Sequence, residues 1–199
     1  MAPQRKAFPR LFATRADPLR LIGDKVFIRP AERGDYDAWA DLRGRSRGFL
    51  TPWEPTWPSD ALTRASFRAR IARYSEDWRS DQGYNFFIFR SDGTLVGGVG
   101  LSNVRRGVAE TASLGYWVGE PFARRGHMTA ALPLVLDFSF DRLRLHRIEA
   151  ACLPSNVPSR ALLLRIGFTE EGYARRYLLI DGKWQDHLLF AILREDWRG

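Results

Sequence analysis

The chain of 199 residues contains one cysteine, Cys152, and no long apolar run. A single thiol can neither close an internal disulfide nor build a metal site. A membrane span needs about eighteen apolar residues in a row, and the N-terminus lacks the apolar core of a signal peptide. We therefore expect a protein of the reducing cytoplasm that has no disulfide, no metal and no membrane span.

Acidic residues are outnumbered, with 23 Asp and Glu against 31 Lys and Arg, which gives a net charge of +8. This excess favours anionic partners, such as a phosphorylated ligand or an RNA-rich particle. The first residues interleave basic and aromatic side chains, namely Arg5, Lys6, Phe8, Arg10, Phe12, Arg15 and Arg20. Such a segment could contact RNA or form a loosely packed arm. We divide the chain into a basic arm, residues 1–23, and one folded domain, residues 24–199.

Hydrophobic periodicity and turn residues predict strands and helices in mixed order around one sheet. Strands are predicted at 26–29, 85–90, 94–101, 109–118 and 147–153, with a final hairpin that turns at Asp181-Gly182. Helices are predicted at 35–49, 60–78, 126–141, where Pro133 should cause a kink, and 156–166. Three prolines within 51–58 predict a stiffened loop. The fold class is α/β (α+β), in a single domain.

Residues 123–129 read Ala-Arg-Arg-Gly-His-Met-Thr and precede an amphipathic helix. Backbone N–H groups in such a turn and in the first helical turn lack partners, so they can hold phosphate at the positive end of the helix dipole. Gly126 allows close approach, while Arg124, Arg125 and His127 add positive charge. Most glycines between arginines lie in turns that are merely solvated. A second signal further along favours an anion site: Asn156 and Ser159 followed by an apolar run.

The order and spacing of these two signals resemble the acetyl-CoA site of the GCN5-related N-acetyltransferases (GNAT). Further segments are similar to the RimJ/RimL type of ribosomal-protein N-terminal acetyltransferase: residues 49–55, 102–107, 114–116, 146–148 and 172–187. The similarity covers roughly residues 24–197. It implies a mixed, mostly antiparallel sheet flanked by helices, whose splayed central strands admit the coenzyme. It also implies acetyl transfer from acetyl-CoA, by direct attack in a ternary complex, to the N-terminal α-amine of a ribosomal protein beginning with alanine or serine.

The same resemblance implies which residues hold the coenzyme. Pantetheine is expected at Tyr116, Trp117 and Val118, with an unpaired N–H of Trp117 or Val118 facing the thioester oxygen. The side chain of Asn156 is expected on a pantetheine amide. Pyrophosphate is expected at Arg124, Arg125, Gly126, His127, Met128 and Thr129. The family's turn usually begins with Arg or Gln where this chain has Ala123, so an arginine after it must supply the charge.

The general acid departs from the common family pattern. Many relatives place a tyrosine seven positions after the capping Asn156, where this chain has Leu163. Ser159 is the expected replacement as acid, and we also expect it to contact the coenzyme. A serine in a first helical turn is more often only a capping group. Water is the alternative proton source.

Two carboxylates compete for the role of general base. Glu54 lies between Trp53 and Trp57 on the proline-rich loop, where an aromatic wall could desolvate it, or it could bind the substrate ammonium instead. Glu149 is its rival on a central strand, and it could also be structural. All three loop residues are expected to bind the acceptor.

Five other residues complete the predictions. The resemblance adds Asn103 and Tyr177 to the expected acceptor site. Asp186 and His187 could act as base through a water, or form a surface pair. Cys152 as an acyl carrier is disfavoured, because no activating charge lies beside it in the sequence.

Two other functions remain open at this point. One is acetylation of a small amine, such as a polyamine, an aminoglycoside or an amino acid, although the sequence shows no acidic cluster for a polycation. The other is a non-catalytic acyl-CoA-binding module that contacts the ribosome through its basic surface. The sequence leaves monomer and homodimer equally open.

Overall fold

The computed structural model describes residues 19–198, so most of the predicted arm lies outside the described residues. One 8-stranded sheet has the order β1-β2-β3-β4-β5-β6-β8-β7. Its strands are β1 (Leu21–Ile22), β2 (Val26–Pro30), β3 (Tyr84–Arg90), β4 (Leu95–Arg105), β5 (Thr111–Val118), β6 (Arg147–Cys152), β7 (Thr169–Ile180) and β8 (Lys183–Leu193). All neighbouring pairs are antiparallel except β5 and β6. The predicted fold class is confirmed.

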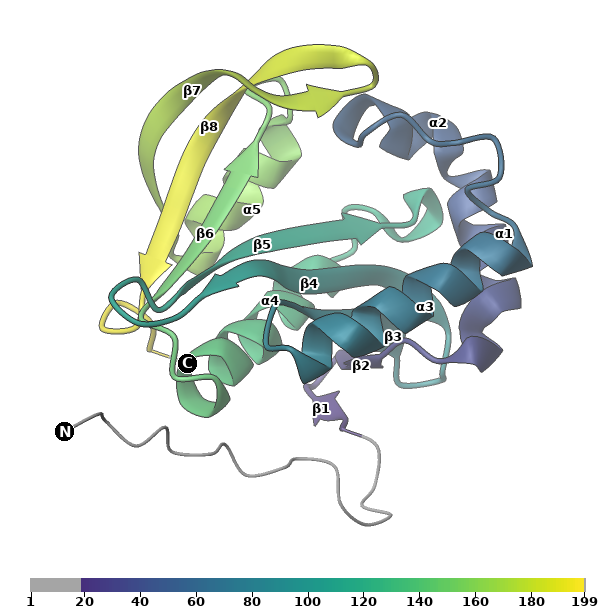
Figure 1. The fold of residues 1–199 in the computed structure, drawn as a ribbon, viewed down its shortest axis with the longest axis horizontal. Coiled ribbons are helices and arrows are strands. Elements are labelled where there is room, and N and C mark those ends of the chain that lie inside the picture. The colour runs from purple at the N-terminus through teal and green to yellow at the C-terminus, as the bar shows by residue number, and fades with distance from the viewer. Residues whose placement is uncertain (1–18, 199) are drawn as a thin grey trace, which may run out of the picture.

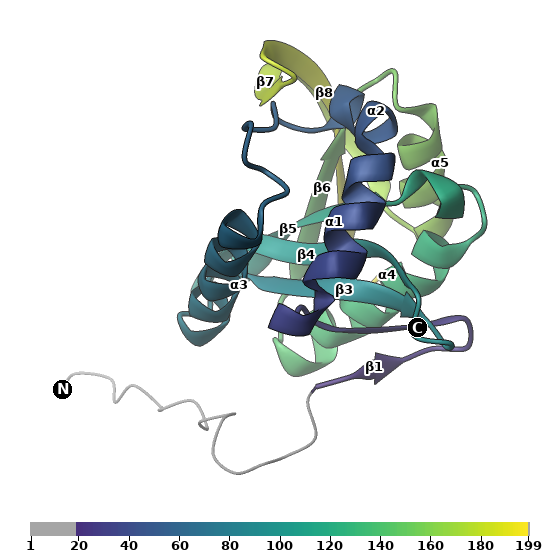
Figure 2. The ribbon, with the colours of Figure 1, turned by 90° about the vertical axis from the view of Figure 1, so that its right-hand side faces the viewer.

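Helices cover both faces of this sheet (Figures 1 and 2). They are α1 (Tyr36–Arg45), α2 (Arg47–Leu50), α3 (Arg64–Arg79), α4 (His127–Asp137) and α5 (Val157–Ile166). Residues along β3 alternate between the faces. Phe87 and Phe89 pack with Trp39 of α1 and Phe67 of α3, whereas Phe86 and Ile88 belong to the core that contains α4. The strand β3 is therefore buried on both of its faces.

The central strands β5 and β6 pair over only part of their length. Their parallel register runs from Thr111 with Arg147 to Leu114 with Ala150, and ends there. Beyond that point β5 continues alongside β4, and β6 continues alongside β8. Figure 1 shows the two strands diverging like the arms of a V. The splay that the family resemblance implied is confirmed.

Several boundaries differ from the sequence prediction. Leu21 pairs with Ile28, so residues 21–22, assigned to the arm, join the sheet. The helix predicted at 35–49 breaks at Ser46, whose hydroxyl accepts a hydrogen bond from the Glu120 N–H at 2.9 Å. The helix predicted from residue 60 begins at Arg64, because the preceding Thr63 caps it. At these points long-range contacts and capping residues set the element boundaries, and hydrophobic periodicity alone does not indicate them.

The remaining predicted helices and the last hairpin are present in the structure. α4 contains Pro133 and continues into a π-helical turn, Phe138–Arg142. α5 is capped by Asn156 and ends at Gly167, whose φ of 107° suits a glycine. The hairpin turns at Asp181-Gly182, and the Asp181 N–H donates to the Glu54 carbonyl at 3.0 Å. The hairpin tip therefore holds the proline-rich loop at the open end of the splay. Within residues 19–198, no helix is long and apolar enough to cross a membrane.

Candidate active site

The arginine-flanked turn has the geometry of an anion site. Gly126 is the N-cap of α4 with φ +79°, Arg124 has φ +58°, and no side chain caps the helix. The N–H groups of residues 124–126 donate to no backbone or side-chain acceptor among the described residues. Arg124, Arg125 and Gly126 are exposed. Unpaired donors at a helix N-terminus beside two arginines suit a diphosphate.

Lys25, which sequence reasoning missed, contacts this turn from the bend between β1 and β2. Its Nζ donates to the Arg125 carbonyl at 3.0 Å, and a Cβ built on Gly126 would lie 3.4 Å from the same nitrogen. The contact joins residues 100 positions apart, so no local pattern could have indicated it. Lys25 adds positive charge at the turn and fixes its backbone.

His127 differs from the expectation that it adds positive charge. Burial lowers the pKa of its imidazole, and the nearby cations Lys25, Arg90 and Arg125 lower it further. The ring packs edge-on against Phe122. His127 is thus neutral near pH 7 and offers the anion only its backbone N–H. Met128 and Thr129 follow in the first helical turn, where only backbone donors face outward, since the Met128 side chain lies in the core.

The splay leaves two main-chain donors of β5 without a strand partner. The Gly119 N–H donates to Val96 of β4 at 2.9 Å. Because successive N–H groups along a strand point in opposite directions, the Trp117 N–H also faces β4, whereas those of Tyr116 and Val118 face the gap. Of the two candidates named from the sequence, Val118 therefore has the N–H that is free to meet a carbonyl oxygen.

A hydroxyl pair connects the splayed strand to α5. The Tyr116 Oη and Ser159 Oγ lie 2.8 Å apart, while the Ser159 N–H donates to Asn156 Oδ1 at 3.2 Å. Burial raises the pKa of Tyr116 to about 12, against the opposing effect of the Ser159 hydrogen bond. The phenol thus stays protonated at physiological pH. Leu163, where many relatives carry tyrosine, is buried in the core.

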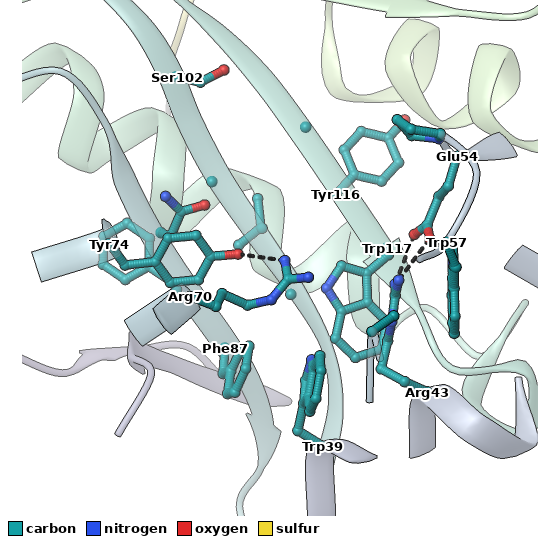
Figure 3. A pocket seen from close by; sticks show the side chains of 18 of the residues that line it. Trp39, Arg43, Glu54, Trp57, Arg70, Tyr74, Phe87, Ser102, Tyr116 and Trp117 are labelled. Carbon is teal, nitrogen blue, oxygen red and sulfur yellow. Dashed lines mark hydrogen bonds and ion pairs between the residues drawn. The ribbon is translucent and has the colours of Figure 1, made fainter. Parts of the chain in front are cut away.

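A pocket of about 440 Å³ opens on the other side of β5, under α1, α3 and the proline-rich loop (Figure 3). Its floor includes Gly98, Gly100 and Gly115, where the absence of side chains creates the depression. A Cβ on Gly98 would come within 2.4 Å of Trp117 Nε1, and one on Gly100 within 2.4 Å of Asn85 Oδ1. Tyr116 lines this pocket too, so it links the pocket to Ser159.

Glu54 lies in this pocket, but its oxygens are occupied. Each oxygen accepts a hydrogen bond from Arg43 at 2.7 Å, and one also accepts from Trp57 Nε1 at 2.8 Å. The Arg43 guanidinium is stacked between the rings of Trp57 and Trp117, 4.2 and 4.9 Å from their centroids. The structure thus presents Glu54 as the anchor of the proline-rich loop, rather than as a proton acceptor desolvated by indoles alone.

Glu149, the rival base, lies outside this pocket. It forms ion pairs with Arg105 at 3.3 Å and with Arg147 at 3.0 Å. Arg147 also pairs with Glu171, which makes a surface network across the strands. This arrangement favours the structural alternative for Glu149.

Of the other acceptor-side candidates, one lines the pocket and three do not. Trp57 lines the pocket, but Trp53 does not. Asn103 has a left-handed backbone conformation at an irregularity in β4, with its amide 3.4 Å from Ser113 Oγ. Tyr177 packs against His187 on the last hairpin. Neither lines the pocket.

Two of the less favoured candidates also have structural partners or surroundings. Asp186 is partly exposed and accepts hydrogen bonds from Tyr173 Oη and from the Arg176 N–H. Burial raises the pKa of the Cys152 thiol, which keeps it un-ionised and suits neither a nucleophile nor an acyl carrier.

The pocket contains polar residues that sequence reasoning missed. They are Arg43, Arg70, Tyr74, Asn85 and Ser102. Asn85 carried the one usable signal, since it is a polar residue at the start of an apolar strand. Arg43 and Arg70 lie on helices that carry other arginines as well, so no sequence pattern singled them out.

A sheet with free donors at its splay, an anion-binding turn on one side and a pocket on the other defines a transferase that brings a phosphorylated cofactor to a second substrate. Residues 25–169 match the model of the Acetyltransferase (GNAT) domain. The chain belongs to this family, and it is an acetyl-CoA-dependent N-acetyltransferase of the RimJ/RimL type.

Individual relatives are similar over nearly their whole length. The [Ribosomal protein uS5]-alanine N-acetyltransferase of Escherichia coli (strain K12) is 36% identical over 182 residues, which cover 90% of this chain and 93% of that relative. A solved structure of Mycobacterium smegmatis RimJ in complex with CoA-disulfide is 39% identical, with a TM-score of 0.81, and the match covers 85% of this chain and 82% of that one. The ribosomal-protein-S5-alanine acetyltransferase of Vibrio fischeri is 28% identical with a TM-score of 0.83, covering 91% and 100%.

Proposed function

We propose that this enzyme acetylates the N-terminal α-amine of a protein, with a ribosomal protein beginning with alanine or serine as the first candidate. Relatives named as acting on ribosomal protein S5 support this choice. The observation that carries it is the charge of the acceptor pocket. Its one carboxylate, Glu54, is paired with Arg43, which leaves no free acidic group for a polyamine or an aminoglycoside. A polycation would meet arginine there instead.

An α-amine also suits a pocket that lacks a free base. Its reference pKa lies near 8, against about 10.4 for a lysine side chain, so loss of its proton at neutral pH is easier by roughly 3 kcal/mol. The positive charge of the pocket lowers the pKa of a bound amine further. Water in the pocket is then a sufficient proton acceptor, and neither Glu54 nor Glu149 needs to take the proton.

The chain's own groups divide the remaining work between the two sides of β5. Acetyl-CoA supplies the acetyl group as a thioester, which the amine attacks directly. The diphosphate is held by Arg124, Arg125 and the backbone N–H groups from Gly126 onward. The side-chain NH2 group of Asn156 is available to hold pantetheine. The Val118 N–H stabilises charge on the carbonyl oxygen.

The Tyr116–Ser159 pair serves as the acid in this proposal. The Ser159 hydroxyl donates a proton to the departing sulfur, and the Tyr116 phenol, 2.8 Å away, restores it. Tyr116 lines the acceptor pocket, so it regains its own proton from the pocket water that accepted the proton of the amine. This arrangement replaces the helix tyrosine of other relatives with a phenol from the neighbouring strand. Contact with the ribosome through basic surface residues would bring the enzyme to its substrate.

Mass spectrometry of ribosomal proteins from cells with and without the gene tests the proposal. We expect one N-terminus to lose its acetyl group on deletion, to regain it with the wild-type gene, and not to regain it with Gly126→Glu. Unchanged ribosomal N-termini, together with acetylation of spermidine by the purified enzyme, would contradict it.

A further inference from the structure

Two arginines line the acceptor pocket in different electrostatic states. Arg43 is neutralised by Glu54. Arg70 of α3 makes one side-chain hydrogen bond among the described residues, from Nη1 to the Tyr74 hydroxyl at 3.3 Å. Within residues 19–198 no carboxylate lies within ion-pair distance of Arg70. The positive charge of the half-buried Arg70 guanidinium is therefore not balanced by a carboxylate among the described residues.

The rest of the lining does not offset this charge. Glu54 is the single carboxylate among the lining residues, and both its oxygens are bound by Arg43. The pocket thus has a net positive charge located at Arg70. A desolvated guanidinium gains most from a carboxylate, which its planar donors match in pairs.

Figure 3 shows where this charge lies. Arg70 and Tyr74 extend over the strands on one side of the pocket, while Arg43, Glu54 and Trp57 occupy the other side. Asn85 of β3 also lines the pocket and adds neutral hydrogen-bonding groups. A guanidinium, a phenol and an amide therefore line the pocket in addition to the Arg43–Glu54 pair.

We propose that Arg70, together with Tyr74 and Asn85, forms a subsite for a carboxylate of the acceptor. The carboxylate is an Asp or Glu side chain that follows the N-terminal residue of the acceptor, or the α-carboxylate of a free amino acid. The inference rests on the proposed function and adds a rule of specificity to it. Acceptors with an acidic group near the reacting amine are selected, whereas basic ones are rejected.

Matched peptides test the subsite directly. A series beginning with alanine carries Glu or Gln at one of positions 2 to 5 and neutral residues elsewhere, with free alanine and glutamate as separate acceptors. We expect Glu to raise kcat/KM over Gln about tenfold at one position, as for a hydrogen bond to a charged group. In Arg70→Gln the kcat/KM values for the Glu and Gln peptides should become equal. In Arg70→Glu a peptide with Lys at that position should have a higher kcat/KM than the peptide with Glu. Arg70→Lys should keep part of it.

Arg68→Gln is the matched control, because Arg68 is an exposed residue of the same helix that does not line the pocket. It should leave the Glu-to-Gln ratio unchanged, and thermal unfolding should show each variant folded. Peptide turnover with equal rates for Glu and Gln, or a ratio that survives in Arg70→Gln, would overturn the subsite while leaving the proposed function intact. Turnover of free amino acids alone, abolished by Arg70→Gln, would support the subsite and overturn the proposed function.

Discussion

The coenzyme side and the acceptor side of β5 are built in different ways. The anion turn is a continuous segment, residues 124–129, whose backbone N–H groups form the site. The acceptor pocket instead collects side chains from α1, the proline-rich loop, α3 and three strands. A backbone site depends on conformation and tolerates changes of side chain, whereas a side-chain site sets specificity and can change with single substitutions. The variants below test this difference.

Replacement of Gly126 should have the largest effect. In Gly126→Glu a side chain and a negative charge enter the anion turn at a position with φ +79°, so acetyl-CoA affinity should fall by about a hundredfold or more. Isothermal titration calorimetry measures the affinity. Gly107→Glu is the control, since Gly107 has φ +77° and open space around it, and it should lose some stability but no coenzyme affinity. Equal loss in both variants would mean that strain, not the anion site, causes the effect.

Glu54→Gln tests the anchor role on the acceptor side. Loss of the carboxylate leaves the Arg43 guanidinium, 11% exposed, without its charge partner, so the free energy of unfolding should fall by about 2 kcal/mol. Peptide KM should rise, while the pH dependence of kcat keeps its shape. Chemical denaturation and a pH–rate profile measure these effects.

Asp41→Asn is the control. It breaks the exposed Asp41–Arg45 pair and should change the free energy of unfolding by less than about 0.5 kcal/mol. Loss of the acidic limb of the pH–rate profile in Glu54→Gln would restore Glu54 as the base.

Ser159→Ala should lower kcat about tenfold with little change in coenzyme affinity, because the hydroxyl acts only on the departing sulfur. Tyr116→Phe should lower kcat by less, and the double variant should be no worse than Ser159→Ala, since both act in one relay. With the pKa of Tyr116 raised to about 12, the phenol keeps its proton through pH 10, so the pair should add no titration between pH 7 and 10. Ser155→Ala, an exposed neighbour, is the control for steady-state kinetics. Additive losses would rule out the relay.

His127→Asn should have the smallest effect. Because its pKa is lowered in the folded state, the folded protein binds fewer protons here than the unfolded chain, so stability is lost as the pH falls below about 6.5. Asparagine should remove that dependence and change acetyl-CoA affinity at pH 7.5 by less than about twofold, since the backbone donor remains. Thermal unfolding from pH 5 to 8 and calorimetry give both quantities. A large loss of affinity at pH 7.5 would indicate a charged imidazole at the phosphate.

The features that were predicted best from the sequence are those that short segments of the chain determine. The anion turn, the Asn156 cap and the Asp181-Gly182 hairpin each follow from conformational needs of neighbouring residues. The break at Ser46 depends on Glu120, far along the chain, and periodicity cannot show it. The strand predicted at 85–90 lies within one residue of β3, because a short apolar run bounded by turn residues is typical of a strand buried on both faces.

The acceptor side was predicted least well for a related reason. Glu54 was placed correctly in the acceptor region, but its partner Arg43 could not be deduced from spacing, and that pairing changes its chemistry. Ser159 was singled out, yet its link to Tyr116 joins residues 43 positions apart. Arg70 gave no signal at all, because a free guanidinium is recognised by what surrounds it.

The most direct test is to give the purified enzyme acetyl-CoA with three acceptors: a peptide beginning with alanine, the same peptide with a blocked N-terminus and an internal lysine, and spermidine. Tandem mass spectrometry locates the acetyl group in each product. We predict acetylation of the free α-amine alone. Acetyl groups on spermidine or on the lysine of the blocked peptide, with the α-amine untouched, would contradict the account of the acceptor pocket.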